Sequence, residues 1–231
     1  MNRPFLACAA LVSAALAGCV GNARIAMPAD VQANTEELRI SGMGGWQDGH
    51  FKLGDSDGRF SRRAARTRIF DAFVRNRGGG TFEVTGPEIG GTAGGRCGFD
   101  EREIDTGLVV VPSGRLTYRC AFQRDGRPVD GHLMLAEVPN GRRPFGGRTR
   151  AGELRLGELV VQIQPIHRAA GGGLPTDMPL GYAFLVEGRQ IGAVDLNGAS
   201  KTIYAPRQAG PERDAVLMAS LAMSVFWDPG S

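Results

Sequence analysis

The chain is poor in histidine and aromatic residues, and this shortage excludes several classes of site. It has 3 His, and aromatic residues make up 7% of its 231 residues. The histidines, His50, His132 and His167, are far apart in the sequence. None stands in the His-x-x-x-His spacing that holds a metal ion on one helix face. We therefore predict no metal site and no bound cofactor other than the covalent lipid considered below.

The local motifs of common catalytic sites are missing too. No Gly-x-Ser-x-Gly elbow for acyl transfer occurs. The glycine-rich stretch 90–98 has neither the Lys-Ser/Thr pair of a phosphate-binding loop nor the spacing of a dinucleotide fingerprint. Residues 55–58, Asp-Ser-Asp-Gly, lack the third acidic ligand and the distal Glu of a calcium loop, which favours a hairpin turn. We identify no catalytic residue, and enzymatic activity stays an open question that leans towards none.

The chain also lacks a large excess of either positive or negative charge. The chain has 27 basic and 24 acidic side chains, a net charge of +3. This balance gives no overall positive field, so nucleic acid is not an expected partner. The 35 glycines lie mostly between short apolar runs, which indicates many turns and few long helices.

One long apolar run is present, at the N-terminus. Arg3 precedes it, and residues 5–16 form a stretch of about twelve residues, too short to cross a hydrocarbon core of roughly 30 Å. It ends in Leu16-Ala17-Gly18-Cys19. This box closely resembles the lipobox of bacterial lipoprotein precursors, and the resemblance covers residues 1–19 only. An ordinary secretory signal, in which Cys19 is incidental, is the alternative.

The resemblance implies a maturation path and a location. Residues 1–18 would be removed as a signal peptide, and Cys19 would carry acyl chains that hold the protein to a membrane. Three chains, at roughly 0.8 kcal/mol per buried methylene, exceed the two signals that stable anchoring needs. Val20 follows the cysteine where an Asp would retain the protein in the inner membrane, so we expect the outer membrane, with the protein facing the periplasm.

Maturation also fixes the number of available thiols. Removing residues 1–18 leaves 231 − 18 = 213 residues and, without Arg3, a charge of 26 − 24 = +2. Cys8 leaves with the signal and Cys19 takes the lipid, so Cys97 and Cys120 remain and are expected to pair in an oxidising compartment. The bridge would stabilise the fold by about 3 kcal/mol. Because the midpoint of the intervening segment is apolar, we expect it to tie a loop to a strand.

Hydrophobic periodicity predicts a mainly β (α+β) fold. Residues 19–35 are expected to be a lipidated, flexible tether, and 36–231 a single β-rich domain. Alternation predicts an antiparallel sheet, sandwich or open barrel of about eight to ten short strands. The candidate segments are 37–41, 50–53, 59–62, 81–85, 108–111, 116–123, 129–138, 154–166, 182–186, 191–196 and 201–204. Turns are expected at 55–58, 125–126 and 188–189, and loops at 139–152 and 169–179. Residues 62–76 fit a helix or a strand equally well.

Only the C-terminus is predicted to be helical, over about 211–227. Pro211 suits a first helical position, and Asp228-Pro229-Gly230 would stop the helix. Residues 215–226 are apolar nearly all round, so this helix should be buried.

The sharpest charged feature is an arginine cluster opposed only by Asp71, which gives 7 − 1 = +6 within residues 59–77. The simpler interpretation is a solvated face. As a candidate anion-binding patch it would suit lipid head groups or lipopolysaccharide phosphates, because arginine forks bind phosphate in a bidentate manner. The cluster consists of Arg59, Arg62, Arg63, Arg66, Arg68, Arg75 and Arg77.

These features favour a non-catalytic binding or structural module of the cell envelope, anchored in the membrane by its acyl chains. One alternative is a hydrolase of envelope polymers, with catalytic residues on distant strand ends. Another is a subunit of a larger envelope assembly that binds a second envelope protein.

Overall fold

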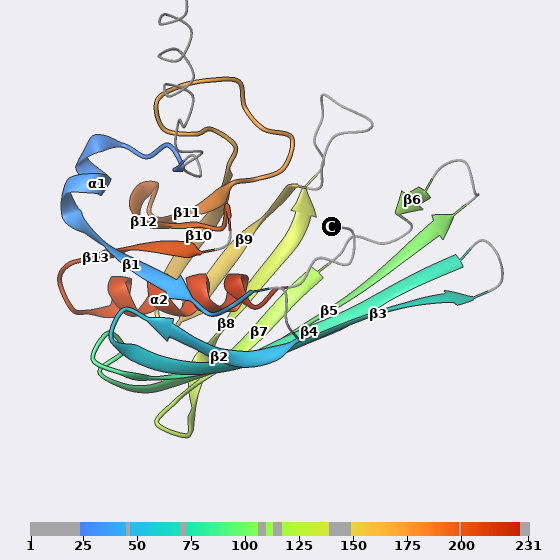
Figure 1. Cartoon of the computed structure of the whole chain (residues 1–231), viewed down its shortest axis with the longest axis horizontal. Helices are drawn as coiled ribbons and strands as arrows, with labels where there is room; N and C mark the ends of the chain where they lie inside the picture. Colours follow the sequence, from blue (N-terminus) through green and yellow to red (C-terminus); the bar gives the residue numbers. More distant parts are fainter. Residues whose placement is uncertain are drawn as a thin grey trace, which may run out of the picture.

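A computed structural model describes residues 24–44, 47–69, 73–105, 110–112, 117–138, 149–198 and 200–226. The predicted signal peptide and Cys19 lie outside this part of the chain. The helices and strands, shown in Figure 1, are α1 (Ala29–Asn34), β1 (Thr35–Ser41), β2 (Asp48–Leu53), β3 (Ser56–Ile69), β4 (Phe73–Gly86), β5 (Gly91–Asp105), β6 (Val110–Pro112), β7 (Thr117–Arg124), β8 (Arg127–Val138), β9 (Thr149–Leu156), β10 (Leu159–Ile166), β11 (Gly181–Val186), β12 (Arg189–Asp195), β13 (Lys201–Pro206) and α2 (Pro211–Ser224).

Twelve of these strands close into an antiparallel barrel. The order around it is β4-β3-β2-β1-β13-β12-β11-β10-β9-β8-β7-β5, and β4 pairs with β5 to complete the ring. The short β6 pairs with the far end of β5. The mainly β, antiparallel prediction is confirmed. The expected number of strands was too low, and the barrel is closed.

Several strand boundaries differ from expectation because two-residue turns interrupt the apolar runs. Residues 154–166, read as one strand, are divided between β9 and β10 by a turn at Gly157, whose φ is 55°. The first hairpin turns at Gly54 and Asp55, so Ser56 already belongs to β3. Residues 149–152, expected in a loop, begin β9.

The turn at Asp125-Gly126 is confirmed. Its φ values are 49° and 75°, the left-handed geometry that the tightest hairpins require. The Glu187-Gly188 turn has the same character, with φ values of 50° and 81°, one residue before the predicted position.

The ambiguous segment 62–76 is strand throughout its described part. β3 and β4 pair continuously from Asp57↔Thr85 to Ile69↔Phe73, and residues 70–72 lie outside the described part. The helical spacing of its apolar residues did not decide the structure. The pairing of β3 with β4 provides hydrogen-bond partners for the backbone of this segment.

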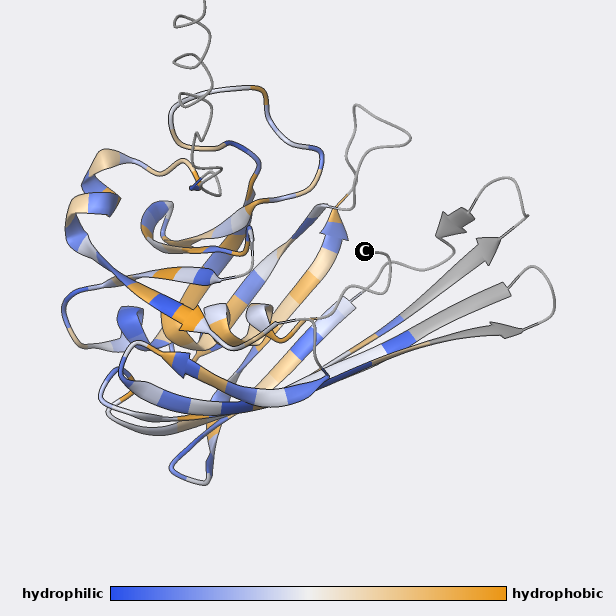
Figure 2. Cartoon of the chain, in the orientation of Figure 1, coloured by the Kyte–Doolittle hydropathy of each residue, from blue (hydrophilic) through white to orange (hydrophobic). Residues whose placement is uncertain are grey.

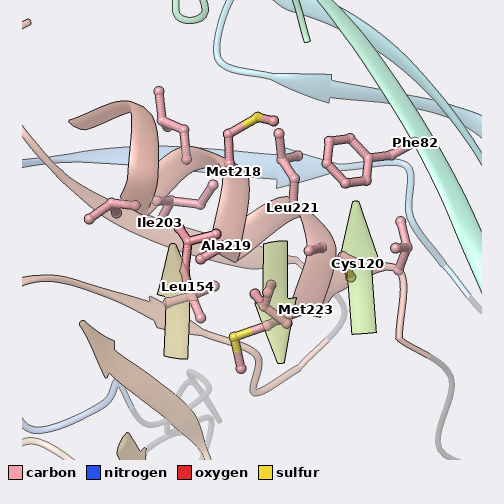
Figure 3. Packing of buried hydrophobic residues seen from close by; sticks show 14 of the residues in the cluster. Phe82, Cys120, Leu154, Ile203, Met218, Ala219, Leu221 and Met223 are labelled. Atoms are coloured by element: carbon pink, nitrogen blue, oxygen red, sulfur yellow. The ribbon is translucent and has the colours of Figure 1, made fainter. Parts of the chain in front are cut away.

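Helix α2 occupies the interior of the barrel, and it ends at Ser224, three residues before the predicted end. Residues 215–225 are all buried. The helix is apolar all round because the sheet surrounds it, as the sequence predicted for a fully buried helix. Figure 3 shows its side chains packed among residues of β4, β7, β9 and β13, namely Phe82, Cys120, Leu154 and Ile203.

Close approach of the helix to the sheet depends on a glycine. A Cβ added at Gly192 of β12 would lie 3.0 Å from a methyl carbon of Val216 and 2.5 Å from the Tyr204 carbonyl oxygen. Neither contact leaves room for a side chain. Gly192 therefore allows α2 to lie directly on the strand.

The last turn of α2 is held by Tyr118 of β7. The Tyr118 hydroxyl donates a hydrogen bond of 2.6 Å to the Ala222 carbonyl, and both residues are buried. The ring of Phe226 packs edge-on against Tyr118 and Phe99, with centroids 4.6 Å and 5.6 Å away. These contacts fix the end of the helix inside the barrel.

The Cys97–Cys120 disulfide is confirmed. The two cysteines are direct partners in the pairing of β5 with β7, and both point inward, with 6% and 2% of their surface exposed. The expectation that the bridge ties a loop to a strand was wrong. The bridge joins β5 and β7, which are neighbours in the sheet but are separated in the chain by β6. The sequence therefore did not reveal that these two strands pair.

Part of the predicted tether belongs to the folded barrel. Ile25 is 1% exposed, and its backbone N–H donates to the Asp195 carboxylate at 3.1 Å. Val31 of α1 is 4% exposed. Residues 24–34 therefore pack on the outside of the barrel, whereas residues 19–23 lie outside the described part.

Candidate functional site: a cationic groove on the barrel wall

Two adjoining hollows lie on the outer face of β3, β4, β5 and β7, and we call them together the outer groove. They enclose about 610 Å³ and about 520 Å³ and meet at Ser61, Thr81 and Arg96. Alternation explains which residues face it. Phe82, Cys97 and Phe99 point into the core, so their strand neighbours point out.

Part of the floor of the outer groove has no side chains. Gly79 of β4 lines the groove on its outward face, and Gly98 of β5 is the partner of Gly79 in the next strand. The pairing places Arg63, Gly79, Gly98 and Arg119 side by side in one row across four strands. With about 4.8 Å between strands, the two arginine Cα atoms in this row are about 14 Å apart. The backbone between them is open to a ligand.

Three arginines beside this floor are not neutralised. Arg63, Arg96 and Arg119 are exposed, and none of them forms an ion pair with another described residue. The two neighbouring arginines, by contrast, have acidic partners. Arg59 lies 2.9 Å from the Glu83 carboxylate, and Arg77 lies 3.4 Å from that of Asp100. Arg63 and Arg96 thus line the outer groove, and Arg119 lies beside it opposite Gly98, all three without an acidic partner among the described residues. Arg59 and Arg77, which also line the groove, are compensated.

The structure divides the predicted arginine cluster. Arg59, Arg63 and Arg77 reach the outer face, and only Arg63 is left without an acidic partner in the described part. The side chains of Arg66, Arg68 and Arg75 lie outside the described part. Arg96 and Arg119 were missed because they come from strands far along the chain. Their signal was the alternation of β5 and β7 with arginine on the outward positions.

Arg62 is a correction to the predicted patch, because it points into the barrel. It is 7% exposed, donates a hydrogen bond to the Gly44 carbonyl, and lies 5.1 Å over the ring of Phe60. Burial lowers the pKa of Arg62, and burial together with the Arg62 charge lowers the pKa of Lys201. Arg62 therefore helps to close the end of the core and is not part of a surface patch.

The three histidines do not converge. His50 on β2 and His132 on β8 are exposed and separated by four strands of the ring. His167 follows β10, and its Nδ1 lies 2.9 Å from the Thr176 carbonyl oxygen. Among the described residues, no group of three or more metal-ligating side chains comes together.

Fold and site together define a closed antiparallel barrel that is filled by its own C-terminal helix and has a cationic groove on its wall. In the part of the chain that the structure describes, no helix has the length and apolar character to span a membrane. Comparison with protein-family models, with curated proteins and with solved structures finds no match to this chain.

Proposed function

We propose that the mature chain is a membrane-anchored lipoprotein that faces the periplasm and binds a phosphate-bearing envelope component in the outer groove, without catalysis. The observation that supports binding is the set of three exposed arginines, Arg63, Arg96 and Arg119, that have no acidic partner among the described residues and lie beside backbone that Gly79 and Gly98 leave uncovered. The interior of the barrel is taken up by α2, so a ligand has access to the outer wall and not to the lumen.

The residue types favour phosphate over other anions. A guanidinium presents parallel N–H groups that match two phosphate oxygens, and it stays charged at every accessible pH. Arg63 and Arg119, about 14 Å apart at their Cα atoms, suit an extended ligand with more than one anionic group. Arg96 lies on β5 between the strands of these two arginines, two residues before Gly98.

The proposed anchor rests on the lipobox-like Leu16-Ala17-Gly18-Cys19. The described part of the chain follows it closely. Only five peptide units separate Cys19 from Arg24, a span of at most about 18 Å. Mass spectrometry of the mature protein should find acyl chains on Cys19 and no residues before it.

The binding proposal is tested with purified lipopolysaccharide and the same material after dephosphorylation. Because each charge-assisted hydrogen bond contributes about 1.5–3 kcal/mol, replacing Arg96 or Arg119 by Gln should weaken binding about tenfold. Arg39→Gln is the matched control, because Arg39 is exposed on β1, outside the outer groove, and has no acidic partner among the described residues, so its replacement should change binding less than about twofold. Equal binding by all variants, or equal binding of the dephosphorylated material, would contradict the proposal.

A further inference from the structure

The loop between β10 and β11 exposes apolar side chains at its tip. Leu174 is 92% exposed and Met178 is 47% exposed. The two other large apolar side chains exposed in the described part, Val138 and Val160, are 36% and 37% exposed and lie on strands. Scattered exposed apolar residues are ordinary, but here the two most exposed occupy one loop.

This loop is tied at its base and holds a defined shape. The Thr176 backbone N–H donates to the His167 carbonyl at 2.8 Å, and the Thr176 hydroxyl donates to the Met178 carbonyl at 2.6 Å. Three successive glycines, residues 171–173, have φ values of 84°, 96° and 112°, which only glycine adopts without strain. Leu174 therefore lies in a short stretch of the loop between two positions, Ala170 and Thr176, that backbone hydrogen bonds fix to the barrel.

The same loop lies directly beside the segment that leads to Cys19. The Ala170 N–H donates to the Arg24 carbonyl at 2.7 Å, and the Ala26 N–H donates to the Arg168 carbonyl at 2.9 Å. In Figure 1 the loop lies at the top of the view, above α1 and the start of the described chain. A lipid on Cys19 would thus enter the membrane within about 18 Å of Arg24, on this side of the barrel.

We propose that the Leu174 loop inserts into the interface of the membrane that holds Cys19, as a second, non-covalent contact. This inference rests on the proposed lipidation. Tethering keeps the loop at high local concentration near the bilayer, so even the burial of one or two side chains suffices for insertion. The charge of the exposed Arg168 at the base of the loop is offset by the exposed Asp177 beside Met178, so the apolar side chains supply the contact.

The test measures access to a thiol placed beside Leu174. In the acylated full chain Cys97 and Cys120 are bridged and Cys19 is blocked, so Pro175→Cys supplies the one free thiol of the mature protein. The protein is inserted into preformed vesicles of phosphatidylethanolamine and phosphatidylglycerol, and its reaction with a water-soluble maleimide is timed. The reference is the same variant with Cys19→Ala, unacylated and in buffer.

Insertion as favourable as the burial of one leucine should slow labelling about tenfold on the vesicles. Adding Leu174→Asp should restore the rate in buffer. Val160→Cys, an exposed apolar position of β10, should react at the same rate in both settings.

Labelling at the full rate, in a protein shown by mass spectrometry to be acylated, would overturn the inference and leave the anchor intact. Protection that survives Leu174→Asp would overturn it too, because the apolar tip would then not be the cause. A mature protein without acyl chains would overturn both proposals.

Discussion

Removing the Tyr118 hydroxyl tests whether the C-terminal helix is locked into the barrel as the structure indicates. In Tyr118→Phe the ring and its contact with Phe226 are kept, and only the donor to the Ala222 carbonyl is lost. No described backbone N–H reaches that carbonyl, since Val225 and Phe226 donate to Leu221 and Met223. Burial raises the pKa of Tyr118 above its ordinary value, so the hydroxyl remains a donor at working pH.

A buried carbonyl without a partner costs about 1–3 kcal/mol, and we take about 2 kcal/mol here because Ala222 has no exposed surface. For roughly 200 ordered residues the entropy of unfolding near the midpoint is about 0.4 kcal/mol/K, so Tm should fall by about 5 °C. The measurement is thermal and urea unfolding followed by circular dichroism, with m unchanged if the denatured state is the same.

Tyr204→Phe is the matched control. Tyr204 faces the outside of the barrel beside Ile25, and its hydroxyl has no hydrogen-bond partner among the described residues. Its removal should change stability by less than about 0.5 kcal/mol. If both variants lose the same stability, or if Tyr118→Phe loses none, the Tyr118–Ala222 bond does not hold the helix.

Two further outcomes follow from buried groups. Reducing the Cys97–Cys120 disulfide, which spans a sequence separation of 23, should lower the free energy of unfolding by about 3 kcal/mol; equal urea midpoints with and without reductant would contradict this. Burial raises the pKa of the Asp195 carboxyl, and the N–H groups of Asn197 and Ile25 only partly oppose it. The folded state therefore holds the Asp195 proton more tightly than the unfolded state, so this contribution to stability is full below about pH 3.8 and is lost as pH rises through the folded-state pKa. In unfolding at a series of pH values, the stability of Asp195→Asn relative to the native chain should rise over that window, and a constant difference would refute the assignment.

Local features of the fold were predictable from the sequence. Alternation placed Tyr118, Cys120 and Phe122 on one buried face, and all three are at most 4% exposed. The Asp125-Gly126 turn follows from dihedral angles that these two residues tolerate. The helix from Pro211 was recognisable from the proline at its first position and from an apolar surface too complete for an exposed helix.

Closure of the barrel was not predictable, because it depends on pairings between distant segments. β1 pairs with β13, and the ring is completed by β4 with β5. No local pattern distinguishes a strand in a closed ring from one in an open sheet. The segment 62–76 was ambiguous for a related reason, since short apolar runs fit both helical and strand periods until a partner strand is known.

The candidate site was found only in part. The sequence pointed to arginines that are close along the chain, but strand alternation sends neighbours to opposite faces, and this removed Arg62 from the patch. Pairing instead brings Arg63 together with Arg96 and Arg119. The contacts between strands, and not proximity in sequence, decide which charges act together.

The positions of the Leu174 loop and the outer groove on the barrel determine from which side a ligand can reach the groove. Around the ring β10 is separated from β5 by β9, β8 and β7, and from β3 by β11, β12, β13, β1 and β2. In Figure 1 the loop after β10 and the strands β3 to β5 accordingly lie at opposite ends of the view, and Figure 2 shows hydrophilic residues recurring along the described parts of those strands. If the Leu174 loop rests on the membrane, the outer groove faces away from it. A phosphate-bearing ligand of Arg63, Arg96 and Arg119, lipopolysaccharide included, would then reach them from the periplasm and not while it is embedded in that membrane.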